Sequence, residues 1–167
     1  MMTTTFPTVI FPLLLIALSV HADFQKIKFK NCKSVFDIKN VEVDGCVGPS
    51  QRHCAFKKGT TPHLRIEFVP TRTTETLETA VRAKIAGGVI VSFNLEQKDP
   101  CKGGNLTCPL QEGETYYYEQ GVTIMKEYPK VDNVQINWLI NDKSNDGAPN
   151  DANKREICII FLTKIIE

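Results

Sequence analysis

The sequence predicts an all-β fold, an immunoglobulin-like antiparallel β-sandwich of seven or eight short strands. Apolar and polar side chains alternate in several short segments, which is the pattern of strands with one buried face. No segment of ten or more residues keeps the periodicity of a helix. Turn signals rich in Gly, Pro, Asn and Asp separate the segments about every ten residues, as in a two-sheet sandwich.

Short predicted strands fill the first half of the chain. The most regular of them lies between Pro62 and Pro70 and places Leu64, Ile66 and Phe68 on one face. The others are mixed segments, one of which ends at a glycine. These strands are predicted over residues 24–31, 35–44, 54–59 and 63–68.

The second half continues in the same way. An aromatic run that begins at Thr115 favours strand structure as far as Tyr128. The last strand is apolar on both faces, as expected of a central strand, and it follows a loop predicted from Asp142 to Arg155. These strands are predicted over residues 89–95, 115–128, 134–140 and 157–166, and residues 81–85 alternate before the glycine pair that precedes the first of them.

One predicted strand and the loop behind it form the most informative stretch. The strand alternates, and its apolar face carries Val89, Val91, Phe93 and Leu95. We therefore expect it to be half-buried. The loop that follows is bounded by Cys101 and Cys108 and contains the sequon Asn105-Leu106-Thr107. This pattern predicts a disulfide-closed surface loop with glycosylation at Asn105.

Residues 1–22 are predicted to be a secretory signal peptide. Their apolar run is too short to span a bilayer, and small or compact residues follow it up to Ala22. Pro7 and Pro12 argue against the alternative, a buried N-terminal strand or helix. Residues 23–167 would then form one domain, either secreted or delivered to the lumen of lysosomes or endosomes.

All six cysteines follow the predicted signal peptide, which favours three disulfides. Six cysteines allow fifteen pairings, but two pairs flank turn signals of their own, which leaves the first cysteine for the last. The pairing favoured by this spacing is Cys32–Cys158, Cys46–Cys54 and Cys101–Cys108. A metal site is disfavoured, because no cysteine pair has the spacing of a zinc site and few histidines accompany them.

Charge and motif content argue against several functions. The chain has 20 Lys and Arg against 19 Asp and Glu, so nothing indicates a binder of nucleic acid. His53 and His63 lack a catalytic motif, and acidic pairs such as Asp142 and Asp146 are interpreted as solvated loop charges. No glycine-rich phosphate loop precedes a helix. We therefore expect neither an enzyme nor a cofactor nor a metal.

Large rings are the remaining feature. The inner faces of the predicted strands carry Phe68, Phe93, Tyr118, Tyr128 and Trp138. Such rings either interdigitate as a core or line a cavity, and composition does not separate these outcomes.

Several short motifs occur in order along the mature chain. They are Phe29-Lys30-Asn31-Cys32, Cys54-Ala55-Phe56-Lys57-Lys58-Gly59, Val91-Ser92-Phe93, Cys108-Pro109, Tyr116-Tyr117-Tyr118, Glu127-Tyr128-Pro129, Trp138 and Cys158. With this set the chain resembles the Niemann-Pick type C-two family of the ML (lipid-recognition) domain, which also includes the group-two mite allergens. The resemblance covers essentially the whole mature chain.

The resemblance implies a sandwich whose sheets splay apart around an apolar cavity, with the same disulfide pairing. It implies a monomeric carrier of a sterol or another small hydrophobic lipid, without enzymatic activity or cofactor, that hands its lipid to a membrane or a receptor. Sterol-carrying members place a Val, a Phe and a Tyr-Pro against the steroid rings, with apolar residues around the entrance. The matching positions are Val91, Phe93, Leu95, Tyr118, Val122, Ile124, Tyr128 and Pro129.

The chain also departs from that family in places. Sterol-binding members often have prolines where this chain has Ile90, Ser92, Asn94 and Glu96, and Met125 replaces a lysine sometimes found near the mouth. A second hypothesis is an innate-immune protein that presents microbial lipid to a receptor, and a third is a structural sandwich with a filled core. Pocket volume separates the sterol carrier from the microbial-lipid protein, because several acyl chains need far more room than one sterol. The structural sandwich would have no cavity larger than a water or two.

Overall fold

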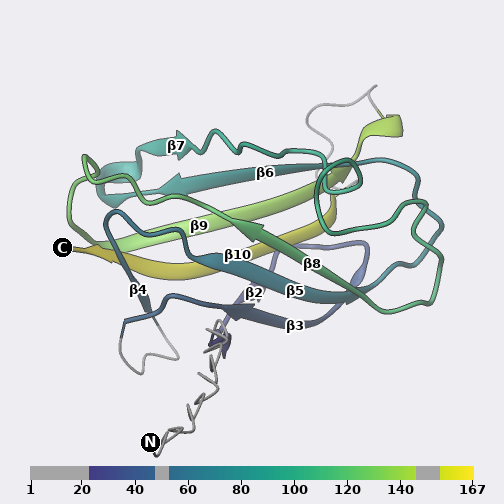
Figure 1. Cartoon of the computed structure of the whole chain (residues 1–167), viewed down its shortest axis with the longest axis horizontal. Helices are drawn as coiled ribbons and strands as arrows, with labels where there is room; N and C mark the ends of the chain where they lie inside the picture. The colour runs from purple at the N-terminus through teal and green to yellow at the C-terminus, as the bar shows by residue number, and fades with distance from the viewer. Residues whose placement is uncertain (1–22, 48–52, 146–154) are drawn as a thin grey trace, which may run out of the picture.

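The computed structural model describes residues 23–47, 53–145 and 155–167; the predicted signal peptide lies outside them. Two β-sheets pack face to face (Figure 1). The described residues contain no α-helix, only two short 3₁₀ turns, η1 (Ala86–Gly88) and η2 (Lys143–Asn145). The strands are β1 (Gln25–Lys26), β2 (Lys30–Asn31), β3 (Asp37–Val43), β4 (Cys54–Lys57), β5 (His63–Val69), β6 (Leu77–Lys84), β7 (Ile90–Ser92), β8 (Tyr116–Gly121), β9 (Val131–Asp142) and β10 (Arg155–Ile166).

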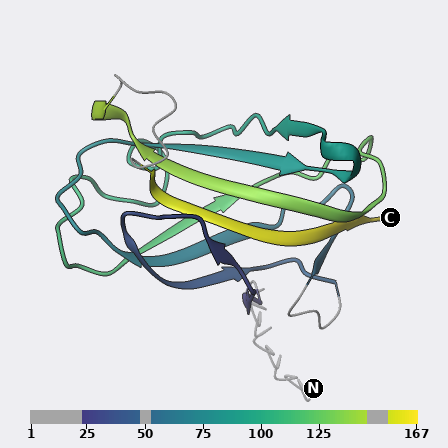
Figure 2. The same cartoon turned by 180° about the vertical axis from the view of Figure 1, so that it is seen from behind.

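The two sheets have different widths. The smaller sheet has the order β1-β3-β5-β8, and the larger has the order β2-β10-β9-β6-β7 with β4 added to β10. Every strand pair is antiparallel except β4 with β10. Seen from behind, the long strands β9 and β10 run side by side through the larger sheet (Figure 2). The predicted all-β sandwich is confirmed, with one parallel pair added.

Alternation predicted the interior strands well. Leu64, Ile66 and Phe68 on β5 are all buried, as expected. β10 pairs with β2, β4 and β9, and four consecutive residues, Glu156 to Ile159, are buried. This placement explains why the last strand is apolar on both faces.

The predicted strand over residues 89–95 is shorter than expected. Only Ile90–Ser92 pair with a neighbour, as the edge strand β7. Val89 and Ile90 are 55% and 62% exposed, so this part of the segment is not half-buried. The reason is physical: alternation shows that a segment has two different faces, but not that another layer covers either of them. Leu95 is buried, but it lies beyond the strand.

The predicted loop between β9 and β10 is confirmed only in part. Asp142 is the last residue of β9 and Arg155 the first of β10, so both belong to strands. The 3₁₀ turn η2 follows β9, and residues 146–154 lie outside the described residues.

The three predicted disulfides are present. Cys32–Cys158 spans 126 residues and joins the end of β2 to β10. The other two close short loops, with separations of 8 residues for Cys46–Cys54 and 7 for Cys101–Cys108. The long bridge therefore constrains nearly the whole domain.

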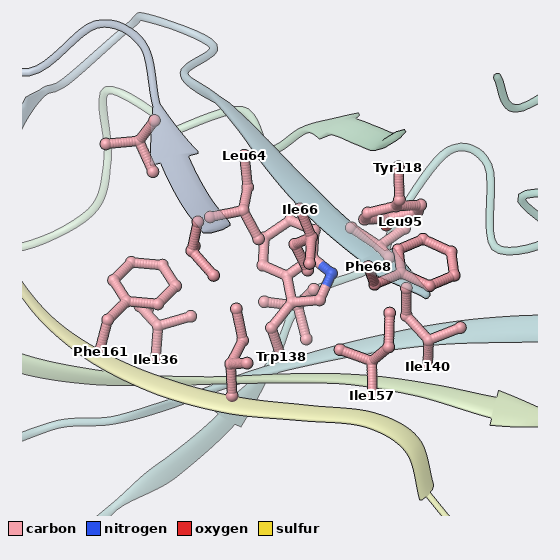
Figure 3. Close-up of a cluster of buried hydrophobic side chains, with 14 of the residues drawn as sticks. Leu64, Ile66, Phe68, Leu95, Tyr118, Ile136, Trp138, Ile140, Ile157 and Phe161 are labelled. Carbon is pink, nitrogen blue, oxygen red and sulfur yellow. The ribbon is translucent and has the colours of Figure 1, made fainter. Parts of the chain in front are cut away.

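One half of the interior is filled with aromatic rings. Phe36 stacks on Phe68 with 5.6 Å between ring centroids, and Tyr116 lies 6.0 Å from Phe68 on the smaller sheet. Tyr118 meets the edge of Trp138 at 6.2 Å, across the two sheets. Figure 3 shows such side chains pointing toward one another from both layers. This half of the interior is therefore a close-packed hydrophobic core.

An ion-pair cluster of two buried carboxylates and the half-exposed Arg72 lies at the filled end. Glu156 is fully buried, and its Oε1 accepts a hydrogen bond from Arg72, while its Oε2 has no hydrogen-bond partner. Arg72 also donates to Asp142 at 3.3 Å, and the Asp142 side chain is only 4% exposed. The interpretation of Asp142 as a solvated loop charge was therefore wrong. Burial raises the pKa of Glu156 above its ordinary value, although Arg72 opposes the shift.

The Glu156→Gln variant should reveal this buried carboxyl through pH. Because the folded-state pKa is raised, Glu156 stabilises the fold below its ordinary pKa, and this contribution is lost as pH rises through the raised pKa. Glutamine does not titrate, so the variant should gain free energy of unfolding relative to wild type over the pH range that starts at the ordinary glutamate pKa, about 4.5, and extends upward from it. Urea titrations of both proteins across this range measure the difference. If the free energy of unfolding of the variant minus that of wild type stays constant or falls as pH rises, the pKa of Glu156 is not raised in the folded protein.

Candidate functional site

The other half of the interior holds a cavity. It lies between the sheets and is lined by Phe161, Thr163 and Ile165 near the end of β10, and it has a volume of about 130 Å³. The end of β10 is beside the letter C in Figure 1. Almost all of its surface is apolar. The lining residues are Val43, Phe56, Pro62, His63, Leu64, Val81, Ala83, Ile85, Val91, Phe93, Val122, Ile124, Tyr128, Pro129, Val134, Ile136, Trp138, Phe161, Thr163 and Ile165.

The larger sheet supplies one wall through alternate residues of neighbouring strands. On β9 these are Val134, Ile136 and Trp138, and β10 places Phe161 opposite Ile136 and Thr163 opposite Val134. Successive side chains of a strand point to opposite faces, so each strand contributes every second residue. The opposite wall comes from the smaller sheet and from the segment that follows β8.

An aromatic pair closes the side of the cavity between the two sheet edges. Phe93 follows the edge strand β7 and is held to β6 by a hydrogen bond from its N–H to the Val81 carbonyl, 2.9 Å. Tyr128 lies in the segment after β8, and the two rings meet edge to face at 6.2 Å. Both rings line the cavity, and Val91 beside them is 43% exposed. The pair thus forms a contact between the two layers at the rim.

Six of the eight sequence-predicted ligand residues line this cavity. They are Val91, Phe93, Val122, Ile124, Tyr128 and Pro129. They belong to two segments that are far apart in the sequence. One contains β7, at the edge of the larger sheet, and the other follows β8, at the edge of the smaller sheet.

The structure corrects the placement of the other two residues. Leu95 and Tyr118 are buried but do not line the cavity. The Tyr118 hydroxyl donates to Thr79 Oγ1 at 3.1 Å while its ring packs on Trp138, so it belongs to the filled half. Burial raises the pKa of Tyr118, which keeps the phenol protonated. Both residues lie in the filled half of the interior, where Figure 3 shows Leu95 close to Tyr118.

Sequence reasoning missed most of the cavity wall. Ile136 on β9 and Phe161 on β10 were assigned only to strands, and Trp138 was left open between core and cavity lining. Their alternation was a usable signal for inward orientation. It carried no information on which inward residues meet a partner and which face empty space.

Two polar side chains near the cavity are engaged by other groups, whereas the buried Nε1 of Trp138 has no hydrogen-bond partner among the described residues. The Thr163 hydroxyl donates to the Cys54 carbonyl, and His63 Nδ1 lies 2.9 Å from Asp44 Oδ2. His63 is therefore paired with a carboxylate. Among the described residues there is no group of three or more His, Cys, Asp or Glu placed to hold a metal ion. Nor do these residues include a helix long and apolar enough to cross a membrane.

The fold and the site together define a two-sheet β-sandwich with an apolar pocket between its sheets. The family model described as the ML domain matches residues 26–149, and the chain belongs to this family. Its resemblance to that family is thereby confirmed.

Curated relatives support the family assignment over most of the chain. The protein heh-1 of Caenorhabditis elegans is 37% identical over 163 residues, which cover 96% of this chain and 99% of that protein. NPC intracellular cholesterol transporter 2 of Bos taurus is 33% identical over 133 residues, covering 79% and 85%.

Solved structures share the fold. A Niemann-Pick type C2 protein from the Japanese carpenter ant superimposes with a TM-score of 0.69 at 21% identity, covering 84% of this chain and all of that one. Chicken MD-1 complexed with lipid IVa gives a TM-score of 0.50 at 18% identity, covering 85% and 96%.

Proposed function

We propose that the protein is a carrier that binds one small hydrophobic lipid, most simply a sterol, in the cavity between its sheets. The observation that carries this proposal is a cavity lined almost wholly by apolar side chains and rimmed by the Phe93 and Tyr128 pair. The bovine relative, named as a cholesterol transporter, supports the choice of a sterol.

The physics of the site suits such a ligand. Burial of apolar surface is worth about 25 cal/mol per Å², and a rigid, flat sterol loses little conformational entropy on binding. The cavity offers almost no polar atom, so a ligand's polar group would have to lie at the rim. No covalent step is required, and the carrier acts by binding and release alone.

The cavity must widen to take this ligand. Its volume of about 130 Å³ is well below the roughly 300–1,000 Å³ of pockets that hold drug-sized molecules. The edge strand β7 is the part best suited to move, because it is short and follows Gly87 and Gly88, both with a φ of 84°. Displacement of β7 would separate Phe93 from Tyr128 and open the rim.

The cavity volume also bears on the other two hypotheses. Chicken MD-1 was solved with lipid IVa, which makes microbial lipid recognition the second candidate. Several acyl chains would need a much larger expansion than one sterol, so the small cavity favours the sterol. A filled structural sandwich is disfavoured, because 130 Å³ exceeds the space of one or two waters, about 30 Å³ each.

We further propose that the carrier is secreted or enters the lumen of lysosomes or endosomes, and that it acts as a monomer. Its three disulfides support an oxidising compartment. A cluster of exposed apolar residues at and near β7 would suit transient contact with a membrane or receptor during lipid hand-off. Its members are Val89, Ile90 and Val91.

A fluorescent-sterol titration tests the proposed function. Wild type should bind saturably with one sterol per chain. Phe93→Ala should bind roughly 10- to 100-fold more weakly, because burial of one phenylalanine is worth about 1.5–3 kcal/mol. Tyr117→Ala is the matched control, since Tyr117 is an aromatic residue that is 54% exposed and does not line the cavity.

Two results would contradict the proposal of a sterol ligand. One is an absence of saturable binding by wild type. The other is undiminished binding by Phe93→Ala while Tyr117→Ala behaves as wild type.

A further inference from the structure

One side chain, that of Asn105, bonds to the outer edge of β8 in the smaller sheet. β8 is the last strand of that sheet, so the described strands pair it only with β5. On β8, the Tyr117 carbonyl accepts a hydrogen bond from Asn105 Nδ2 at 2.7 Å, and the Glu119 N–H donates to Asn105 Oδ1 at 2.9 Å. The Asn105 amide therefore takes the place that a neighbouring strand would occupy.

The loop that carries this asparagine is built to place it. The Cys101–Cys108 disulfide closes the loop, and the Leu106 side chain is buried in the core. A Cβ atom on Gly104 would lie 2.6 Å from the Pro100 carbonyl oxygen, so only glycine fits before the asparagine. Despite this anchoring, Asn105 itself is exposed, as a modification site must be.

The same nitrogen is the acceptor of the predicted glycosylation. In that reaction Nδ2 attacks the anomeric carbon of a sugar carried on a lipid diphosphate. The bond from carbon to phosphate oxygen breaks, the bond from carbon to Nδ2 forms, Nδ2 loses one proton, and the lipid diphosphate leaves. The amide keeps a single N–H, and its geometry decides which hydrogen bonds survive.

That geometry conflicts with the contact on β8. Both hydrogen bonds of Asn105 run to the same edge of one strand, so the donated hydrogen lies on the same side of the amide as Oδ1. In a trans secondary amide the substituent on nitrogen takes that side and the remaining hydrogen points away. The cis arrangement is strongly disfavoured. A sugar on Nδ2 would thus occupy the space between the amide and the Tyr117 carbonyl.

We propose that Asn105 is a clamp on the free edge of β8, and that this clamp and a glycan on Asn105 exclude each other. The glycan turns the amide away from the strand, and both hydrogen bonds are lost together. β8 leads directly into Val122, a residue of the cavity wall, so the clamp also secures the start of that segment. The proposal stands independently of the identity of the ligand.

Hydrogen exchange at the Glu119 amide tests the proposal in protein secreted from eukaryotic cells. Thr107→Ala removes the sequon but keeps Asn105, so the clamp should be intact and the amide slow. Asn105→Ala removes both. The amide should exchange roughly two- to tenfold faster in Asn105→Ala and in the glycosylated wild type, as expected for the loss of a net hydrogen bond.

Each outcome decides one part of the proposal. Equal exchange in Asn105→Ala and Thr107→Ala would overturn the clamp. A glycosylated wild type as protected as Thr107→Ala would overturn the exclusion. A wild type that leaves the cell with its sequon unused and its Glu119 amide protected supports the exclusion, with the clamp as the prevailing state.

Discussion

The Ala83→Phe variant should lose sterol binding while the fold survives. Ala83 is a buried residue of β6 that lines the cavity and lies opposite Ile136 and Val91 in the sheet. A phenylalanine ring there would occupy much of the 130 Å³ that the ligand needs. Loss of about 120 Å² of buried ligand surface corresponds to about 3 kcal/mol, or roughly a 100-fold weaker affinity. The fluorescent-sterol titration measures this loss.

A matched variant separates cavity filling from general damage. Arg82→Phe adds the same ring to the neighbouring, exposed position of β6, which points to the opposite face of the sheet. It should bind sterol like wild type. Thermal unfolding should show that both variants remain folded. Equal affinity in Ala83→Phe and Arg82→Phe would mean that the ligand does not occupy this cavity.

Replacing Cys32 and Cys158 together by serine should lower the free energy of unfolding by about 4–5 kcal/mol, the largest stability effect that we expect from one bridge. The bridge closes a loop of 126 residues, and the entropy that a cross-link removes from the unfolded chain grows with loop length. Denaturant titration of the double variant against wild type measures the change.

The short bridge Cys101–Cys108 provides the comparison. Its separation is only 7 residues, so its double serine variant should lose about 2–3 kcal/mol. If the short bridge proves to matter as much as the long one, the chain-entropy explanation is wrong and local contacts of the bridges dominate.

The local sequence pattern predicted the strands and the disulfides because both depend mainly on residues that are close together in the sequence. Leu64, Ile66 and Phe68 alternate strictly and are all buried. The short disulfides follow from cysteines that flank their own turns, and the long one follows by elimination. Pairing at a sheet edge is not local, which is why the segment containing Ile90 was predicted as a longer, half-buried strand.

The site could be predicted only in part because a cavity is a property of two layers. Phe93 and Tyr128 were found through family motifs, and the structure brings their rings together. Tyr118 matched a motif equally well but lies where the opposite sheet supplies a partner ring. The cluster of Arg72 and Glu156 escaped notice for the same reason, since it joins residues 84 positions apart.

Native mass spectrometry of the protein purified from eukaryotic cells shows directly whether the cavity holds one lipid. Purified wild type should carry a single lipid-sized mass increment that organic extraction removes and identifies. Ala83→Phe, expressed in the same cells, should appear as the bare chain. A wild type that remains bare in the presence of excess sterol and other lipids, or an equal increment in Ala83→Phe, would mean that the cavity is not a lipid-binding site.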